Sequence, residues 1–159
     1  MVWNPGKIFK AYFYLWLAMR KKLVTHDRLF NIDPSIKCLF CSSQPEDHNH
    51  LFFNFVVSPQ IWTRVQNNCG IQVPSLPWDI LINWFANNWK DSSFSTKIRK
   101  LCLAATVYNI WFERNCRYYT NSCSCVAHIS ATINELDRIK LSTMRGVQDY
   151  SCNRSLQDM

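Results

Sequence analysis

Glycine is scarce in this sequence, which has 3 in 159 residues. Tight turns between strands draw heavily on glycine, so its scarcity argues against a β-sandwich or barrel and favours helices. The sequence has no Gly-rich phosphate loop and no Gly-x-Ser-x-Gly nucleophile elbow. These absences exclude P-loop nucleotide hydrolases and α/β-hydrolases.

Acidic residues are also few: 11 Asp and Glu stand against 18 Lys and Arg, which gives a formal charge of +7. The acids are dispersed, without the paired carboxylates that two-metal phosphoryl transfer needs. We therefore expect a non-catalytic chain with no small-molecule substrate. A positive excess favours polyanions, of which nucleic acid is the commonest in a cell. Arg20, Lys21 and Lys22 form the tightest basic cluster and are predicted to contact RNA or DNA.

Long apolar runs are missing. The best candidate for a leader or span covers residues 11–19, too short for the ~20 residues that cross a bilayer, and no small-residue cleavage site follows it. We expect no membrane partner and an intracellular chain, in the nucleus or cytoplasm, with reduced thiols. In that setting the 8 cysteines suggest metal binding before disulfides.

Hydrophobic residues make up 48% of the chain and aromatic residues 14%, enough for a packed core. Apolar side chains recur at helical spacing over 8–22, 47–53, 58–69, 78–88, 96–119 and 125–145, with a short helix expected after Thr25. Ser58 is the expected N-cap of its helix. The pattern predicts an all-α fold of about six helices in one compact domain. Tyr118 and Tyr119 are expected to be partly exposed. Most other aromatic side chains are expected in the core, among them Phe9, Phe13, Trp16, Trp62, Phe85, Trp111 and Phe112.

A metal site is suggested by Cys38 and Cys41, followed by His48 and His50. Two cysteines two residues apart can place both sulfur atoms on one zinc ion, and a later histidine can add a third ligand. On a helix, His48 and His50 would not share a face. The alternative is a pair of buried cysteines that pack as small hydrophobic side chains.

A second group, Cys123, Cys125 and His128, is more simply explained as a helix start that contains cysteines.

Several segments occur in a characteristic order: Trp3, FYLWLA at 13–18, LVTHDRL at 23–29, Cys38-x-x-Cys41, HLFF at 50–53, Ser58-x-x-x-Trp62 and IWFERN at 110–115. The series resembles the zinc-binding domain of plant reverse transcriptases, the C-terminal region of non-LTR (LINE-type) retrotransposon polyproteins. The resemblance covers roughly residues 3–119. It implies a zinc site and a nucleic-acid-binding accessory role. No Tyr-x-Asp-Asp polymerase motif is present, so reverse transcription is not implied.

The resemblance assigns zinc ligation to Cys38, Cys41 and His50 and places the family's last cysteine where this chain has Phe55. His48 is the nearest replacement. We expect an N-terminally truncated zinc-binding-like domain over 1–119, a helix over 120–146 that packs on it and a disordered tail over 147–159. Two alternatives are a helical protein-interaction module, offering an apolar stripe of the 96–119 or 125–145 helix to a partner, and a translated relic without retained function.

Overall fold

The computed structural model describes residues 5–29, 37–54, 57–69, 72–74, 76–133 and 135. The described chain is helical and contains no strand, which confirms the all-α expectation. Its elements are α1 (Pro5–Met19), a 3-10 helix η1 (His26–Leu29), a π-helix η2 (His50–Asn54), α2 (Val57–Cys69), α3 (Trp78–Asn88) and α4 (Phe94–Thr120). Residues 126–133 are helical as well. The expected tail over 147–159 lies outside the described residues.

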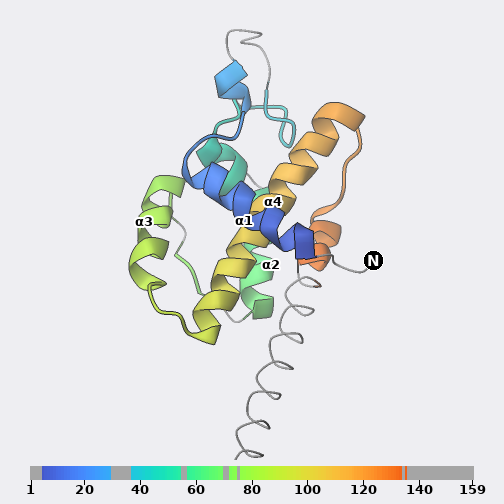
Figure 1. Cartoon of the computed structure of the whole chain (residues 1–159). Helices are drawn as coiled ribbons and strands as arrows, with labels where there is room; N and C mark the ends of the chain where they lie inside the picture. Colours follow the sequence, from blue (N-terminus) through green and yellow to red (C-terminus); the bar gives the residue numbers. More distant parts are fainter. Residues whose placement is uncertain are drawn as a thin grey trace, which may run out of the picture.

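Helix α4 is the centre of the fold (Figure 1). It is capped by Ser93, whose hydroxyl oxygen accepts a hydrogen bond from the amide of Thr96 at 3.2 Å. Residues 101–107 are buried all round the helix, so this stretch is enclosed by the other elements. The 96–119 helix therefore cannot offer this stretch to a partner as an open apolar stripe.

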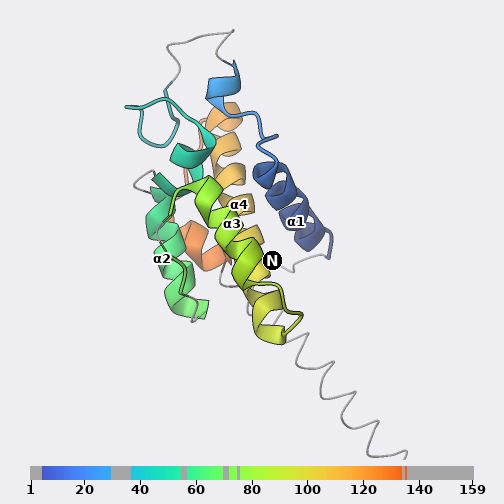
Figure 2. The ribbon, with the colours of Figure 1, turned by 90° about the vertical axis from the view of Figure 1, so that its left-hand side faces the viewer.

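Helices α1 and α2 lie on opposite sides of α4, as the second view shows (Figure 2). The face of α1 that packs inward consists of Ala11, Leu15 and Ala18. Helix α1 contacts α4, where the rings of Tyr14 and Tyr108 lie 5.5 Å apart, and Ala104 and Ala105 of α4 belong to the same core cluster. Small side chains on both helices permit a short distance between the helix axes.

The inward face of α1 corrects the sequence prediction. Phe9, Phe13 and Trp16 were expected in the core, and they are 77%, 54% and 45% exposed. Nearly every side chain of α1 is apolar, so periodicity alone could not identify the packing face. The contact of α1 with α4 buries the alanines and leaves the large rings outside. Phe112 of α4, also expected inside, is 54% exposed.

Aromatic side chains join α3 and η2. The indole of Trp78 is buried against Phe52 and Phe53, with ring centroids 5.1 and 5.4 Å apart. The amide of Trp78 donates to Asn49 Oδ1 at 2.9 Å. The bounds predicted for α3 are confirmed. Trp62, Phe85 and Trp111 are buried, as expected, and Tyr118 and Tyr119 are exposed, as expected.

Ser58 does not cap α2 from outside. The helix already includes Val57, and the buried Ser58 hydroxyl donates to the carbonyl of Leu51. This bond ties the start of α2 to η2. Beyond α4, Ile129 and Ile133 lie in the core, so the described part of the predicted C-terminal helix packs on the domain.

Candidate metal centre

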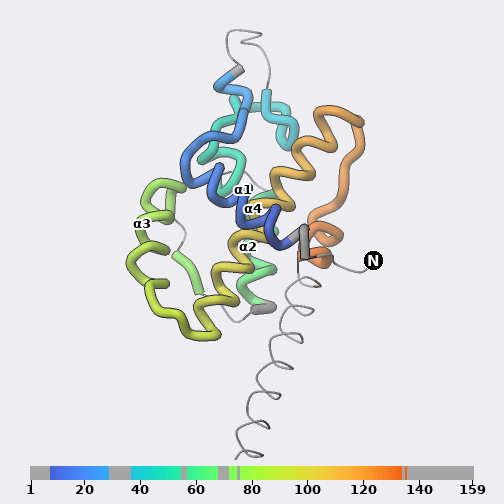
Figure 3. Tube along the Cα trace, viewed as in Figure 1, coloured from blue at the N-terminus to red at the C-terminus, as the bar shows by residue number. Residues whose placement is uncertain are grey.

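The segment 37–54 lies at the end of the bundle where α4 finishes (Figure 3). It folds into a tight turn because the amide of Cys38 donates to the carbonyl of Gln44 and the amide of Ser42 donates to the carbonyl of Cys38, both at 2.8 Å. Ser42 has a positive φ of 53°, a left-handed conformation that reverses the chain. Within the turn the amide of Phe40 points at Cys38 Sγ, 3.4 Å away.

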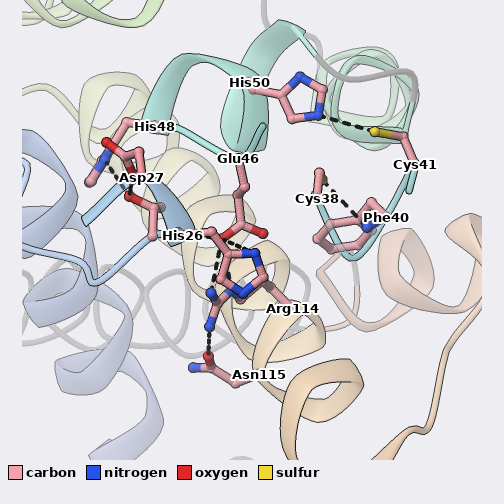
Figure 4. A network of polar contacts seen from close by, with 11 residues as sticks. His26, Asp27, Cys38, Phe40, Cys41, Glu46, His48, His50, Arg114 and Asn115 are labelled. Atoms are coloured by element: carbon pink, nitrogen blue, oxygen red, sulfur yellow. Dashed lines mark hydrogen bonds and ion pairs between the residues drawn. The ribbon is translucent and has the colours of Figure 1, made fainter. Parts of the chain in front are cut away.

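Three potential metal ligands meet at this turn (Figure 4). The potential ligand atoms, one from each of Cys38, Cys41 and His50, all lie within 4.8 Å of one another. The Cys41 Sγ to His50 Nε2 distance is 3.5 Å. A sulfur and a nitrogen ligand on a tetrahedral zinc ion are separated by about 3.5 Å, given Zn–S of about 2.3 Å and Zn–N of about 2.0 Å. The group therefore fits three corners of a zinc tetrahedron with little movement.

His50 is the first residue of η2, and its backbone is held by Asp47. Its amide donates to Asp47 Oδ1 at 2.6 Å, which caps the turn that leads into η2. The two residues after it, Leu51 and Phe52, are fully buried and anchor η2 in the core. The histidine is thus fixed to the helical bundle, and the cysteine turn meets it from the other side.

The two thiols have opposite tendencies to ionise. Burial raises the pKa of Cys38 to about 11, against the lowering effect of amide hydrogen bonds from Phe40 and Cys41. Burial also acts to raise the pKa of Cys41, but hydrogen bonds from Ser43, Gln44 and His50 outweigh it and lower that pKa to about 6. The thiolate is the form of cysteine that binds metal, and with a pKa of about 6 Cys41 is mainly thiolate at neutral pH.

His48 is not part of this group. Its Nδ1 lies 3.4 Å from the hydroxyl of Thr25, and its ring lies 6.1 Å from that of Phe52. The side chain is buried on the Asp27 side of the segment, whereas His50 points toward Cys41 (Figure 4). The structure thus brings three of the four predicted ligands together and places the fourth elsewhere. Phe55, at the position of the family's last cysteine, lies outside the described residues.

A buried ion pair attaches the segment 37–54, which contains the candidate ligands and is called the metal-site segment below, to α4. The Glu46 carboxylate accepts hydrogen bonds from Arg114 Nε at 3.0 Å and from the amide of His26 at 3.2 Å, and Arg114 Nη2 is 2.9 Å away. Both charged side chains are nearly inaccessible to solvent. Figure 4 shows them pointing toward each other. The Arg114 guanidinium also lies 5.1 Å from the ring centroids of both Trp111 and Tyr118.

Sequence reasoning missed this pair. Arg114 follows Val107 by seven residues and Ile110 by four, so it falls on the buried face of α4. A charged residue in the register of a core stripe is the feature that could have revealed it. The IWFERN series at 110–115 thus supplies the arginine that binds Glu46 beside the metal site.

A second arginine contacts the cysteine turn directly. The Arg117 guanidinium lies 4.4 Å from the ring centroid of Phe40, and its Nη1 donates to the carbonyl of Leu39 at 3.4 Å. Glu113, itself buried, holds Arg117 through an ion pair of 2.9 Å. The last turns of α4 therefore form the surface on which the turn rests.

The basic cluster predicted to contact nucleic acid lies at the end of α1. Arg20, Lys21 and Lys22 are exposed. The amides of Lys21 and Lys22 donate to the carbonyls of Ala18 and Leu17, and Lys21 has a φ of 51°. This is a Schellman motif with lysine at the position that usually holds glycine. Lys21 Nζ also pairs with Asp79 of α3 at 2.8 Å.

The second cysteine group forms no such site. Cys123, Cys125 and His128 are exposed, and among the described residues only the first group brings three potential ligands together. None of the described helices is long and apolar enough to cross a membrane.

Comparison with known proteins agrees with the geometry. No curated protein and no solved structure matches the chain. Residues 1–62 match a family described as zinc-binding in reverse transcriptase. The matched segment contains the Cys38, Cys41 and His50 group. The match confirms, for residues 1–62, the resemblance to a reverse transcriptase zinc-binding domain seen in the sequence, whereas its extension to residue 119 and its plant, non-LTR origin stay predictions.

Proposed function

We propose that this chain is a non-catalytic accessory module that binds one structural zinc ion through Cys38, Cys41 and His50 and contacts nucleic acid. The convergence of these three donors inside the segment that matches the family is the observation that carries the proposal. Zinc in this position would pin the cysteine turn to η2. Water, or a residue outside the described part of the chain, would complete the tetrahedron.

Contact with nucleic acid is supported by charge and by exposure. The chain carries a formal charge of +7, and its tightest basic cluster, Arg20 to Lys22, is exposed at the end of α1. Phosphate contacts by such side chains supply sequence-independent affinity that falls steeply with salt. The residue series in the sequence further supports an origin in a plant non-LTR retrotransposon, with a site of action in the nucleus or cytoplasm.

Zinc content in a matched pair of histidine variants tests the ligand set. We expect about one zinc per chain, by elemental analysis, in wild-type protein purified under reducing conditions. His50→Asn and Cys38→Ser should lose it, because each removes a ligand. His48→Asn should keep it, since His48 is buried in the same segment but faces Thr25. Loss of zinc from His48→Asn with retention in His50→Asn would refute this ligand set, and folded wild-type protein without zinc would refute zinc binding.

A further inference from the structure

The outward face of α1 carries a continuous row of large apolar side chains. The row consists of Phe9, Tyr12, Phe13, Trp16 and Met19, each of which lies three or four residues from another member and is at least 40% exposed. The rings of Phe13 and Trp16 stack on each other with centroids 6.1 Å apart and planes 22° from parallel. We refer to these five residues as the α1 aromatic face. Exposed apolar patches of this kind usually mark a binding surface.

Two positively charged side chains lie over an aromatic ring of this face. The Arg20 guanidinium lies 5.4 Å from the centroid of the Trp16 ring, and the Lys22 ammonium lies 5.8 Å from it. Lys10, on the same helix, is exposed. Helix α1 contains no acidic residue, and the acid paired with this end of the helix is Asp79, which holds Lys21. Aromatic surface and cations therefore occur together, without negative charge on the helix itself.

We propose that the α1 aromatic face is a stacking platform for single-stranded nucleic acid. Unpaired bases expose their flat faces, and proteins that bind single strands stack those faces on aromatic side chains while cations hold the phosphates. A base that stacks on Trp16 displaces a cation from the ring and leaves it beside the phosphate of the same nucleotide. A duplex keeps its base faces buried in the stack, so it meets only the cations.

This inference rests on the proposed nucleic-acid contact and adds a preference for unpaired strands. A protein partner with a plain apolar surface would not use the two cations that lie over the Trp16 ring. An unpaired strand uses both features, since it supplies base faces and phosphates at adjacent positions. The charge complementarity between this face and a polyanion is the reason to favour nucleic acid as its occupant.

Fluorescence anisotropy with zinc-loaded full-length protein tests the platform. The probes are a fluorescein-labelled 20-mer of thymidine and its duplex with a 20-mer of deoxyadenosine. We expect the single strand to bind more tightly. Phe13→Leu/Trp16→Leu should weaken single-strand binding about 10-fold or more and leave duplex binding within about twofold, because stacking contributes substantially per base. Trp16→Phe, which retains a ring, should bind nearly as the wild type does.

Two control variants separate the contributions. Tyr119→Leu removes an aromatic ring that is 75% exposed on α4, and it should leave both affinities unchanged. Arg20→Gln/Lys22→Gln should lower the affinity for both probes and reduce the salt dependence of binding. The substituted side chains are exposed, and circular dichroism of each variant verifies that it is folded.

Three outcomes would overturn the platform. No binding of either probe by the wild type would remove the nucleic-acid contact and the platform with it. Equal affinity for both probes, reduced only by Arg20→Gln/Lys22→Gln, would preserve the contact and refute stacking. A wild-type dimer in sedimentation that Phe13→Leu/Trp16→Leu dissociates, without an effect on single-strand affinity, would assign the face to a second copy of this chain.

Discussion

At the scale of single residues, the two cysteines of the turn differ in what surrounds their sulfur atoms. Cys38 is fully buried, and burial raises its pKa to about 11. Cys41 is half-buried, and its pKa falls to about 6 because hydrogen bonds from Ser43, Gln44 and His50 outweigh the effect of burial. Without metal, therefore, one thiol of the pair is ionised near neutral pH and the other is protonated.

This difference predicts selective alkylation. In zinc-free protein at pH 7, Cys41 would be mainly thiolate, the reactive form, because its pKa is about 6. Iodoacetamide should therefore modify Cys41 well before Cys38, as peptide mapping by mass spectrometry would show. Lowering the pH from 7 to 5 should slow the Cys41 reaction, because protonation through a pKa of about 6 removes the thiolate. Zinc should protect both cysteines, and equal rates at Cys38 and Cys41 without zinc would contradict the prediction.

At the scale of elements, the metal-site segment is attached to α4 by the buried pair of Glu46 and Arg114. Burying two charges carries a desolvation penalty that only close pairing offsets. Removing one partner leaves the other charge buried and unpaired, which is strongly destabilising. The same carboxylate accepts the amide of His26, and the amide of Asp27 donates to the Glu46 carbonyl at 3.0 Å. Three separate segments thus depend on one acidic residue.

Removing the arginine should therefore be costly. We expect Arg114→Met to lower the free energy of unfolding by about 3–5 kcal/mol, since it leaves Glu46 buried without a counter-charge. Adding Glu46→Gln to Arg114→Met should recover part of that loss, because it removes the unpaired charge. Urea unfolding followed by circular dichroism measures both.

The exposed pair of Lys21 and Asp79 offers a control for this experiment. Asp79→Asn should change the stability by less than about 1 kcal/mol, because both partners are solvated. A loss of that small size in Arg114→Met would show that the buried pair contributes little to the fold.

Much of this element-level architecture was predictable, and the failures have identifiable causes. Helix α3 and the all-α class followed from periodicity and from the scarcity of glycine. The inward face of α1 did not, because apolar residues surround the helix and only its contact with α4 decides which of them are buried. Spacing predicted a site at Cys38 and Cys41 with His48 and His50 as candidates, and the family resemblance singled out His50. The position of His48 depends on its contact with Thr25, which spacing does not reveal.

At the scale of the whole molecule, the candidate metal ligands border the hydrophobic core. The core cluster is built from α1, α2, α3, α4 and the helix at 126–133, and it includes Leu51 and Phe52 of η2. Cys38, Cys41 and His50 are not members of this cluster, although Cys38 is fully buried and Phe40, between the two cysteines, packs against it. A small zinc finger unfolds without its metal because it has little other core. Here the helices bury their own apolar surface, so we expect the fold of the bundle not to depend on zinc.

Chelation should consequently loosen the turn and leave the helices intact. After zinc is removed with EDTA, far-UV circular dichroism should change little and the melting temperature should fall, since a ligand bound only to the folded state stabilises it. Hydrogen exchange should quicken at the amides of Cys38 and Ser42, which close the turn. The amides of residues 101–107, the stretch of α4 that the other elements enclose, should stay protected from exchange. Loss of most helical signal on chelation would mean instead that zinc organises the whole domain, and that the apolar contacts around α4 are too weak to hold it alone.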